Sequence, residues 1–246
     1  MRFMRHNSWD DALFVSYAVK DKDSLQKRLP SGLVLDLHRG TAYISVVALT
    51  EAGIVPWPSG VPLEWVKCFG LTHHAVNVRT YVKPAPGMAG PPGIFFFSLD
   101  CSALLPTLGA KALFNLPYRF GSMRRAPRAL ASRELRSDRL EANWRECDVD
   151  DTALGKFIVE RYSLYQAPGV LLHRLFGVRS PVWCGIITHA PWPLRKAKLL
   201  EWRTTVLEAV GLADLVEAQA GEEPIVHCSV GVGPIDFFWS GGLQGA

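Results

Sequence analysis

Short runs of β-branched and aromatic residues, separated by glycine and proline, recur along almost the whole chain of 246 residues. Such runs predict strands, because these side chains pack well on a pleated sheet while glycine and proline favour turns. The 21 glycines and 17 prolines are spread throughout, as turns between short strands require. Helical patterns are too few to alternate regularly with the strands, as a parallel doubly wound sheet would need. The sequence therefore predicts a barrel-like α+β fold with a few inserted helices.

Individual segments follow the same logic. We expect strands at residues 13–19, 74–82, 93–100, 161–166 and 183–189, more strands within 119–146, and a final strand pair at 226–239. Residues 33–38 and 41–49 flank Arg39-Gly40, which indicates a hairpin. The proline-rich residues 50–70 predict a loop or lid. Helices are expected at residues 25–29, after Ser102, after Thr152 and, as the longest pattern, at residues 194–210 with Gly211 as C-cap.

Charge and hydropathy limit the class of protein. The net charge of +4 comes mostly from arginines between residues 119 and 145. No nucleic-acid motif accompanies them, so we interpret this stretch as a solvated strand face, with an anionic surface as the alternative partner. The apolar runs are too short to span a bilayer and the N-terminus has no apolar signal core, which predicts an intracellular protein, cytoplasmic or organellar. No linker or repeat is visible, so we expect one domain over residues 1–246.

Cysteines and histidines do not form a metal-site pattern. Five cysteines are odd in number and widely spaced, which predicts reduced thiols rather than disulfides or a zinc site: Cys68, Cys101, Cys147, Cys184 and Cys228. The histidines, including His73-His74, never show the spacing of a helical metal site. We find no Walker loop, no Gly-x-Ser-x-Gly elbow and no Gly-x-Gly-x-x-Gly turn, so the sequence predicts neither a metal nor a cofactor.

Several sequence blocks occur together in a fixed order over nearly the whole chain. They include Leu29-Pro-Ser-Gly-Leu33, Asn77-Val-Arg-Thr-Tyr-Val82, Phe95-Phe-Phe-Ser-Leu-Asp100, Leu116-Pro-Tyr118, Glu160-Arg-Tyr-Ser-Leu-Tyr165, His189-Ala-Pro-Trp-Pro-Leu194 and His227-Cys-Ser-Val-Gly-Val232. In these blocks the chain resembles the uncharacterised YqjF-like family of the acetoacetate decarboxylase-like superfamily. The resemblance implies an antiparallel β-cone or barrel with a closed interior pocket, and it implies no established activity.

The chain departs from the superfamily's enzymes at the reactive position. Those enzymes form an imine between a β-keto acid and a lysine that follows a Phe-Pro pair after a helix. Here residues 110–117 match the approach, but Tyr118 and Arg119 come next. A phenol cannot form an imine, and an arginine stays charged and non-nucleophilic. Many relatives also carry a glutamate at the position of Ala75, so two features argue against decarboxylation through an imine.

One strand carries the candidate ligand-binding residues. If residues 74–82 form a strand, Asn77, Arg79 and Tyr81 share one face and apolar residues share most of the other. Arg79 can then hold a carboxylate or phosphate inside the fold, or it can pair with a buried acid such as Asp100 or Glu160. Tyr118, with Arg119 beside it, is either a donor to the ligand or a buried structural tyrosine.

These observations leave three functions open. The first is a module that binds a small apolar molecule bearing a carboxylate or carbonyl, through Asn77, Arg79, Tyr81, Tyr118 and Arg119. The second is a lyase, hydrolase or isomerase that uses Tyr118 and Arg79 as catalytic candidates without an imine. The third is a structural subunit, either of a homo-oligomer or of a larger assembly. The missing lysine favours the first and third over chemistry.

Overall fold

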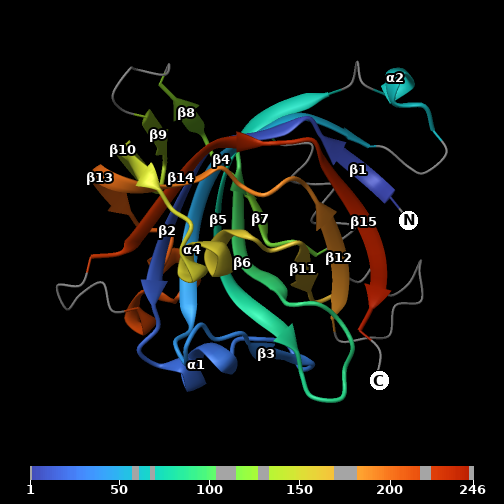
Figure 1. Cartoon of the computed structure of the whole chain (residues 1–246), viewed down its shortest axis with the longest axis vertical. Coiled ribbons are helices and arrows are strands. Elements are labelled where there is room, and N and C mark those ends of the chain that lie inside the picture. The colour runs from blue at the N-terminus through green and yellow to red at the C-terminus, as the bar shows by residue number, and fades with distance from the viewer. Residues whose placement is uncertain are drawn as a thin grey trace.

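The computed structural model describes residues 2–56, 61–66, 70–103, 115–126, 133–168, 182–216 and 223–243. Within these ranges strands greatly outnumber helices, as the sequence predicts (Figure 1). The strands are β1 (Arg2–His6), β2 (Ser8–Ala18), β3 (Leu33–Leu35), β4 (Tyr43–Pro56), β5 (Leu71–Pro84), β6 (Gly93–Cys101), β7 (Tyr118–Phe120), β8 (Met123–Arg125), β9 (Arg133–Ser137), β10 (Leu140–Val149), β11 (Ser163–Gln166), β12 (Trp183–Thr188), β13 (Leu194–Thr204), β14 (Ile225–Val232) and β15 (Ile235–Gly242). The helices are α1 (Lys22–Gln26), α2 (Leu63–Val66) and α4 (Ala153–Val159), with short 3-10 helices η2 (Glu208–Val210) and η3 (Ala213–Leu215).

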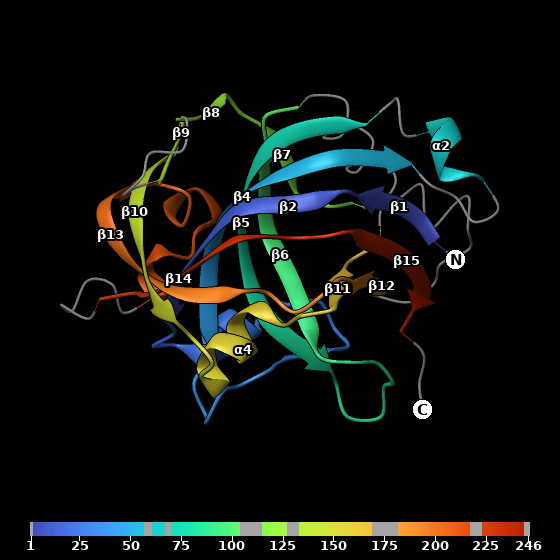
Figure 2. The same ribbon diagram turned by 45° about the horizontal axis from the view of Figure 1, so that its top comes forward.

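All these strands belong to one sheet. Its order is β3-β5-β6-β11-β12-β15-β1-β4-β2-β14-β13-β10-β9-β8, with β7 beside β6. An additional pairing of β4 with β5 joins two distant points of this order, so β4, β5, β6, β11, β12, β15 and β1 close into a ring. The strands that follow β2, from β14 to β8, curve away from β4 and are called the wing below (Figure 2). β4 therefore belongs to the ring and is connected to the wing through β2.

Two hydrophobic clusters lie on opposite faces of the central strands. Val76, Val78 and Val82 of β5 belong to one cluster, whereas Tyr81 belongs to the other. The cluster of Tyr81, called the inner core, takes residues from most strands of the ring and from α4, including Phe14, Val47, Ile94, Ile158, Trp183, Ile187, Trp192 and Phe237. The second cluster, called the outer core, extends into the wing and includes Trp144. The alternation of side chains along β5 thus decides which core each residue faces.

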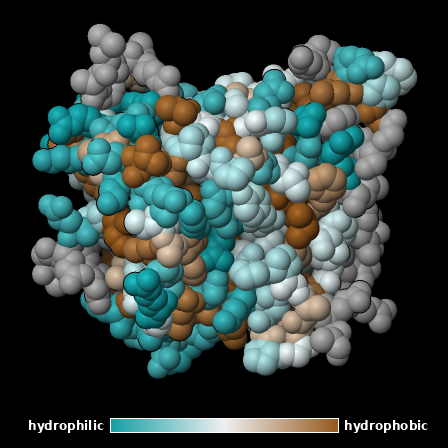
Figure 3. Space-filling model, viewed as in Figure 1, coloured by the Kyte–Doolittle hydropathy of each residue, from teal (hydrophilic) through white to brown (hydrophobic). Residues whose placement is uncertain are grey.

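The arginines at 119–145 are only partly a solvated face. The wing presents many hydrophilic residues to solvent (Figure 3), and Arg136 is 57% exposed beside Glu134. Arg133, in contrast, is largely buried and binds Asp11 at 2.9 Å as well as Glu146. The guanidinium of Arg125 lies 5.6 Å from the ring centroid of Trp144. Part of the positive charge therefore holds the wing together rather than facing solvent.

Local signals predicted several elements correctly. Thr152 caps α4, because its side chain accepts a hydrogen bond from the backbone N–H of Gly155. Arg39 and Gly40 form a tight turn with positive φ values of 50° and 84°, and His38 and Thr41 exchange backbone hydrogen bonds across it. The hairpin expected around this turn is wrong, however. β3 pairs with β5 instead of β4.

Three further expectations are wrong. Residues 194–210 form β13 and η2 instead of a helix, although Gly211 still provides the left-handed C-cap. Residues 50–56 continue β4 and residues 63–66 form α2, where we expected one loop. The last two strands do not pair with each other, since β14 lies between β2 and β13 while β15 lies between β1 and β12. Most of the helix expected after Ser102 falls outside the described residues. No helix in the described ranges has the length and apolar content needed to cross a bilayer.

Candidate functional site

The inner face of β5 carries a row of buried polar side chains. Asn77, Arg79 and Tyr81 are 5%, 8% and 0% exposed. They lie on the face opposite Val76, Val78 and Val82, as predicted from the alternation of the strand. The Tyr81 hydroxyl is hydrogen-bonded to the Ser45 hydroxyl at 2.6 Å, so it has a partner within the fold. The Asn77 side-chain oxygen has no hydrogen-bond partner among the described residues.

Arg79 is a buried cation without an anion. Its Nη2 donates to the backbone carbonyl of Ile158 at 3.0 Å, and its Nε has no hydrogen-bond partner in the described part of the chain. Burial lowers the pKa of Arg79, an effect that Tyr81 opposes, but an arginine remains charged at neutral pH. Leaving such a charge without a counter-ion is costly. A buried guanidinium in this setting can form an ion pair with an anion that enters the fold.

Neither acid considered as a partner forms an ion pair with Arg79. Asp100 lies on the face of the sheet opposite Arg79, where its Oδ2 is 3.6 Å from Nη1 of Arg139. Glu160 accepts hydrogen bonds from the Trp192 backbone N–H at 2.9 Å and from the Tyr162 hydroxyl. Both carboxylates thus have other partners.

Aromatic rings surround the guanidinium of Arg79. Its central carbon lies 5.4 Å from the ring centroid of Phe14 and 5.8 Å from that of Tyr81. Phe14 contacts Trp192 edge-on at 5.4 Å, and Trp192 stacks on Trp9 at 6.0 Å. This apolar wall excludes water from the charge, which strengthens any ion pair that Arg79 makes.

Tyr118 lies on the inner face but belongs to a different neighbourhood. On β7 it is paired with Leu99, and Leu99 is paired in turn with Asn77. Burial raises the pKa of Tyr118 well above its ordinary value, with Glu51 and Cys101 adding to the effect. In the described residues we find no hydrogen bond between Tyr118 and Arg79. Arg119 is paired with Asp100 in the same ladder, so it lies on the opposite face from Tyr118. Burial raises the pKa of Asp100, and the nearby Arg139 and Arg119 oppose this shift.

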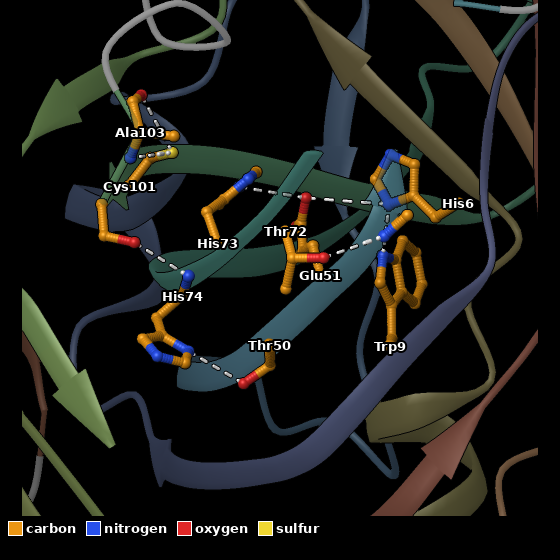
Figure 4. Close-up of polar contacts among 11 residues, drawn as sticks. His6, Trp9, Thr50, Glu51, Thr72, His73, His74, Cys101 and Ala103 are labelled. Atoms are coloured by element: carbon orange, nitrogen blue, oxygen red, sulfur yellow. Dashed lines mark hydrogen bonds and ion pairs between the residues drawn. The ribbon is translucent and has the colours of Figure 1, made fainter. Parts of the chain in front are cut away.

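The neighbourhood of Tyr118 contains a carboxyl group between two imidazoles (Figure 4). Glu51 of β4 is paired with His73 of β5, and its Oε2 lies 3.4 Å from His73 Nε2 and 3.7 Å from His6 Nδ1. The Trp9 indole donates to His6 Nδ1 at 2.9 Å, which fixes the imidazole as an acceptor at that nitrogen. We call Glu51, His6 and His73 the Glu51 cluster. His74, the next residue on β5, points to the other face and contacts Thr50 at 3.0 Å.

Burial shifts the pKa values of all three residues of the Glu51 cluster. It raises the pKa of Glu51 to about 7. Burial also lowers the pKa of His6 to about 3 and that of His73 to about 4, because a charged imidazole is poorly solvated there. Both imidazoles are therefore neutral at neutral pH, while Glu51 divides between its acid and carboxylate forms. A carboxyl group of this kind can both give and take a proton near neutrality.

Sequence reasoning missed Glu51 altogether. The sequence predicts the end of the preceding strand at residue 49, because prolines and glycines are frequent in the segment that follows. The strand in fact continues to Pro56, and Glu51 takes its place on the inner face in register with His73. The adjacent His73-His74 pair does not have the spacing of a helical metal site, so the sequence gives no reason to single it out. The described residues contain no group of three side chains able to hold a metal.

Comparison with known proteins agrees with this architecture. The sequence pattern of DUF2071, described as an uncharacterized conserved protein, matches residues 6–233. The chain belongs to the DUF2071 family. It is 28% identical over 242 residues to the uncharacterized protein YqjF of Bacillus subtilis (strain 168), covering 92% of this chain and 87% of that protein. The resemblance to YqjF-like proteins is thereby confirmed.

Solved structures extend the likeness of this DUF2071 chain to the acetoacetate decarboxylase-like fold. Acetoacetate decarboxylase of Legionella pneumophila superposes with a TM-score of 0.65 at 12% identity, over 99% of this chain and 87% of that one. The enduracididine biosynthesis enzyme MppR, in a complex with pyruvate, gives a TM-score of 0.59 at 12% identity, over 98% and 90% of the two chains. The predicted fold class is confirmed. At these identities the likeness concerns the fold alone.

The titration of Glu51 predicts a pH-dependent stability difference between the wild-type DUF2071 protein and Glu51→Gln. Because burial raises the Glu51 pKa from 4.5 to about 7, the folded state keeps a proton that the unfolded state releases between these values. The resulting stability is complete below pH 4.5 and is lost as the pH rises to about 7. Glu51→Gln does not titrate, so it should gain up to about 3 kcal/mol relative to wild type across this window. Urea unfolding at several pH values measures the difference, and a constant difference would contradict the raised pKa.

Proposed function

We propose that this DUF2071 protein binds a small molecule bearing a carboxylate inside the ring of strands, with Arg79 as the counter-ion and without forming an imine. The observation that carries the proposal is the buried Arg79 guanidinium, which interacts with the Ile158 carbonyl and with Tyr81 but forms no ion pair with a carboxylate among the described residues. A ligand carboxylate can accept a charge-assisted hydrogen bond from the vacant Nε. The surrounding Phe14, Trp9 and Trp192 rings suit an apolar ligand body.

One further observation supports a small oxo acid as the ligand, and another argues against imine chemistry. A related fold, that of MppR, is known in complexes with pyruvate and with a condensation product of pyruvate and an aldehyde. In this chain the residue after Leu116-Pro117 is Tyr118, which has no amine to condense with a carbonyl group. The proposal therefore combines reversible anion binding with the absence of imine chemistry at that position.

Arg79→Met tests the proposal directly. Calorimetric titration with pyruvate and with acetoacetate should show a dissociation constant at least about 10-fold weaker than in wild type, since a hydrogen bond to a charged group is worth about 1.5–3 kcal/mol. The free energy of unfolding should fall little, because no acid among the described residues loses an ion pair with Arg79.

The matched control is Arg203→Met, which removes an arginine that is 76% exposed and should leave binding unchanged. If Arg79→Met binds both acids as wild type does, Arg79 is not the anion site. If the change instead destabilises the fold by about 3–5 kcal/mol, Arg79 serves the structure rather than a ligand.

A further inference from the structure

The geometry points to a second, separate centre: we propose that Glu51, held between His6 and His73 and near Tyr118, is a general acid–base that enolises a neutral carbonyl compound. Figure 4 shows the carboxyl group of Glu51 between the two imidazoles. The residues come from four different strands, β1, β4, β5 and β7, and all lie on the inner face. Such convergence of titratable groups on a buried surface is what proton-transfer sites require.

The contacts between Glu51 and the two imidazoles leave several buried ring nitrogens without a hydrogen-bond partner among the described residues. Its distances to His73 and His6 are 3.4 and 3.7 Å, beyond those of tight charge-assisted hydrogen bonds. Both ring nitrogens of His73 and the Nε2 of His6 have no hydrogen-bond partner in the described residues, although these imidazoles are almost fully buried. The Glu51 side chain keeps 12% of its surface accessible. These unsatisfied atoms can serve a substrate.

The charge of the centre selects the class of substrate. In the described part of the chain, His6 of β1 and His73 of β5 lie beside Glu51, and Tyr118 of β7 interacts electrostatically with both Glu51 and Cys101 of β6. Burial keeps both imidazoles and the phenol neutral near pH 7, so none of these groups supplies a positive charge. An anionic substrate would meet the Glu51 carboxylate with no compensating cation from these groups. The centre therefore suits an uncharged aldehyde or ketone.

The centre is distinct from the anion site. His73 and Arg79 are six residues apart on β5, which corresponds to about 20 Å between their Cα atoms along an extended strand. The guanidinium of Arg79 contacts Ile158 of α4, whereas Glu51 lies beside His73 near the opposite end of β5. A ligand as small as pyruvate cannot span both positions. The inference therefore does not depend on anion binding at Arg79.

The step we assign to this centre is a proton transfer. The Glu51 carboxylate accepts the proton from the carbon next to the carbonyl group, and the C–H bonding electrons form the carbon–carbon double bond of the enol. The carbonyl π electrons move to oxygen, which takes a proton from the Tyr118 hydroxyl or from a neutral imidazole. A carboxylate base combined with neutral imidazole or phenol donors is a known arrangement for enolisation. Reversal returns every proton, so no co-reactant is needed.

Deuterium exchange with hydroxyacetone tests the inference. In D2O the wild-type protein should accelerate exchange of the protons next to the carbonyl group, measured by proton NMR, at least about 100-fold more than Glu51→Gln, in line with the usual contribution of a positioned base. The rate should rise with pH to a plateau, with a midpoint near the Glu51 pKa of about 7. Tyr118→Phe should slow exchange without moving that midpoint, because the base is unchanged.

The matched control uses neighbouring histidines on opposite faces of β5. His73→Asn should slow exchange, whereas His74→Asn should not, since His74 contacts Thr50 on the other face. Circular dichroism melting verifies that each variant is folded. The inference is overturned if wild type exchanges hydroxyacetone no faster than the buffer, or if Glu51→Gln exchanges it as fast as wild type. Pyruvate titrations report separately on Arg79, so failure of one proposal does not imply failure of the other.

Discussion

Replacing Arg161 with methionine should destabilise the protein by about 3–5 kcal/mol, the usual effect of breaking a buried ion pair. Arg161 is 8% exposed and donates to the Asp36 carboxylate at 2.8 Å, and its Nε donates to the Phe157 carbonyl at 2.7 Å. Its guanidinium also lies 4.1 Å from the Phe157 ring centroid. Methionine keeps much of the side-chain volume but leaves Asp36, which is 17% exposed, without its cation. The buried Arg79 and Arg161 should thus lose very different amounts of stability on the same substitution, because among the described residues only Arg161 has an acid as its partner.

Urea unfolding of Arg161→Met, Arg79→Met and the exposed Arg203→Met provides the comparison. Adding Asp36→Asn to Arg161→Met should restore part of the lost free energy, because it removes the uncompensated charge. A loss below about 1 kcal/mol for Arg161→Met would show that the pair is screened like a surface pair.

Gly93→Ala should disrupt the closure of the ring. A Cβ atom at Gly93 would lie 2.6 Å from the backbone oxygen of Ser163 and 2.4 Å from its hydroxyl oxygen. The parallel ladder between β6 and β11 consists of the pairs Ile94 with Leu164 and Phe95 with Tyr165, directly after Gly93. Because the obstacle is backbone, the two strands must separate to admit a methyl group. We expect a loss of about 3 kcal/mol or more in the free energy of unfolding.

Gly121→Ala is the matched control for this experiment, since its nearest contact would be Asp138 at 3.9 Å. Both variants receive the same methyl group, so thermal and urea unfolding isolate the effect of the clash. If Gly93→Ala and Gly121→Ala unfold alike, the junction of β6 and β11 does not limit the stability of the ring.

Local chemistry allowed parts of this fold to be predicted. The alternation of β5 placed Asn77, Arg79 and Tyr81 on one face, and Thr152 marked the start of α4, because both signals depend on residues close in sequence. Residues 194–204 show the limit of such signals. Their leucines fit a helical spacing, but the exposed lysines between them fit a strand equally well, and pairing with β10 decides the outcome.

The candidate site depends more strongly on long-range pairing. Arg79 and Tyr118 were identified from the sequence, but their separation into different neighbourhoods follows from the register of β4, β5, β6 and β7. Glu51 could not be placed while β4 was expected to end early. Its partner His6 comes from β1, whose position beside β4 is set by only two residue pairs. Contacts of this kind leave no periodic pattern in the sequence.

The position of β4 between β2 and β5 has a consequence for local unfolding. β4 is hydrogen-bonded to β2 along one edge and to β5 along the other through residues 44–50. Opening the ring at β6 and β11, or detaching the wing beyond β14, leaves both of these ladders intact. The backbone that carries Glu51 and faces Arg79 should therefore belong to the last cooperative unit to open. We therefore expect peripheral strands to fray, and so to admit or release a molecule, while the spacing between Glu51 and Arg79 stays fixed.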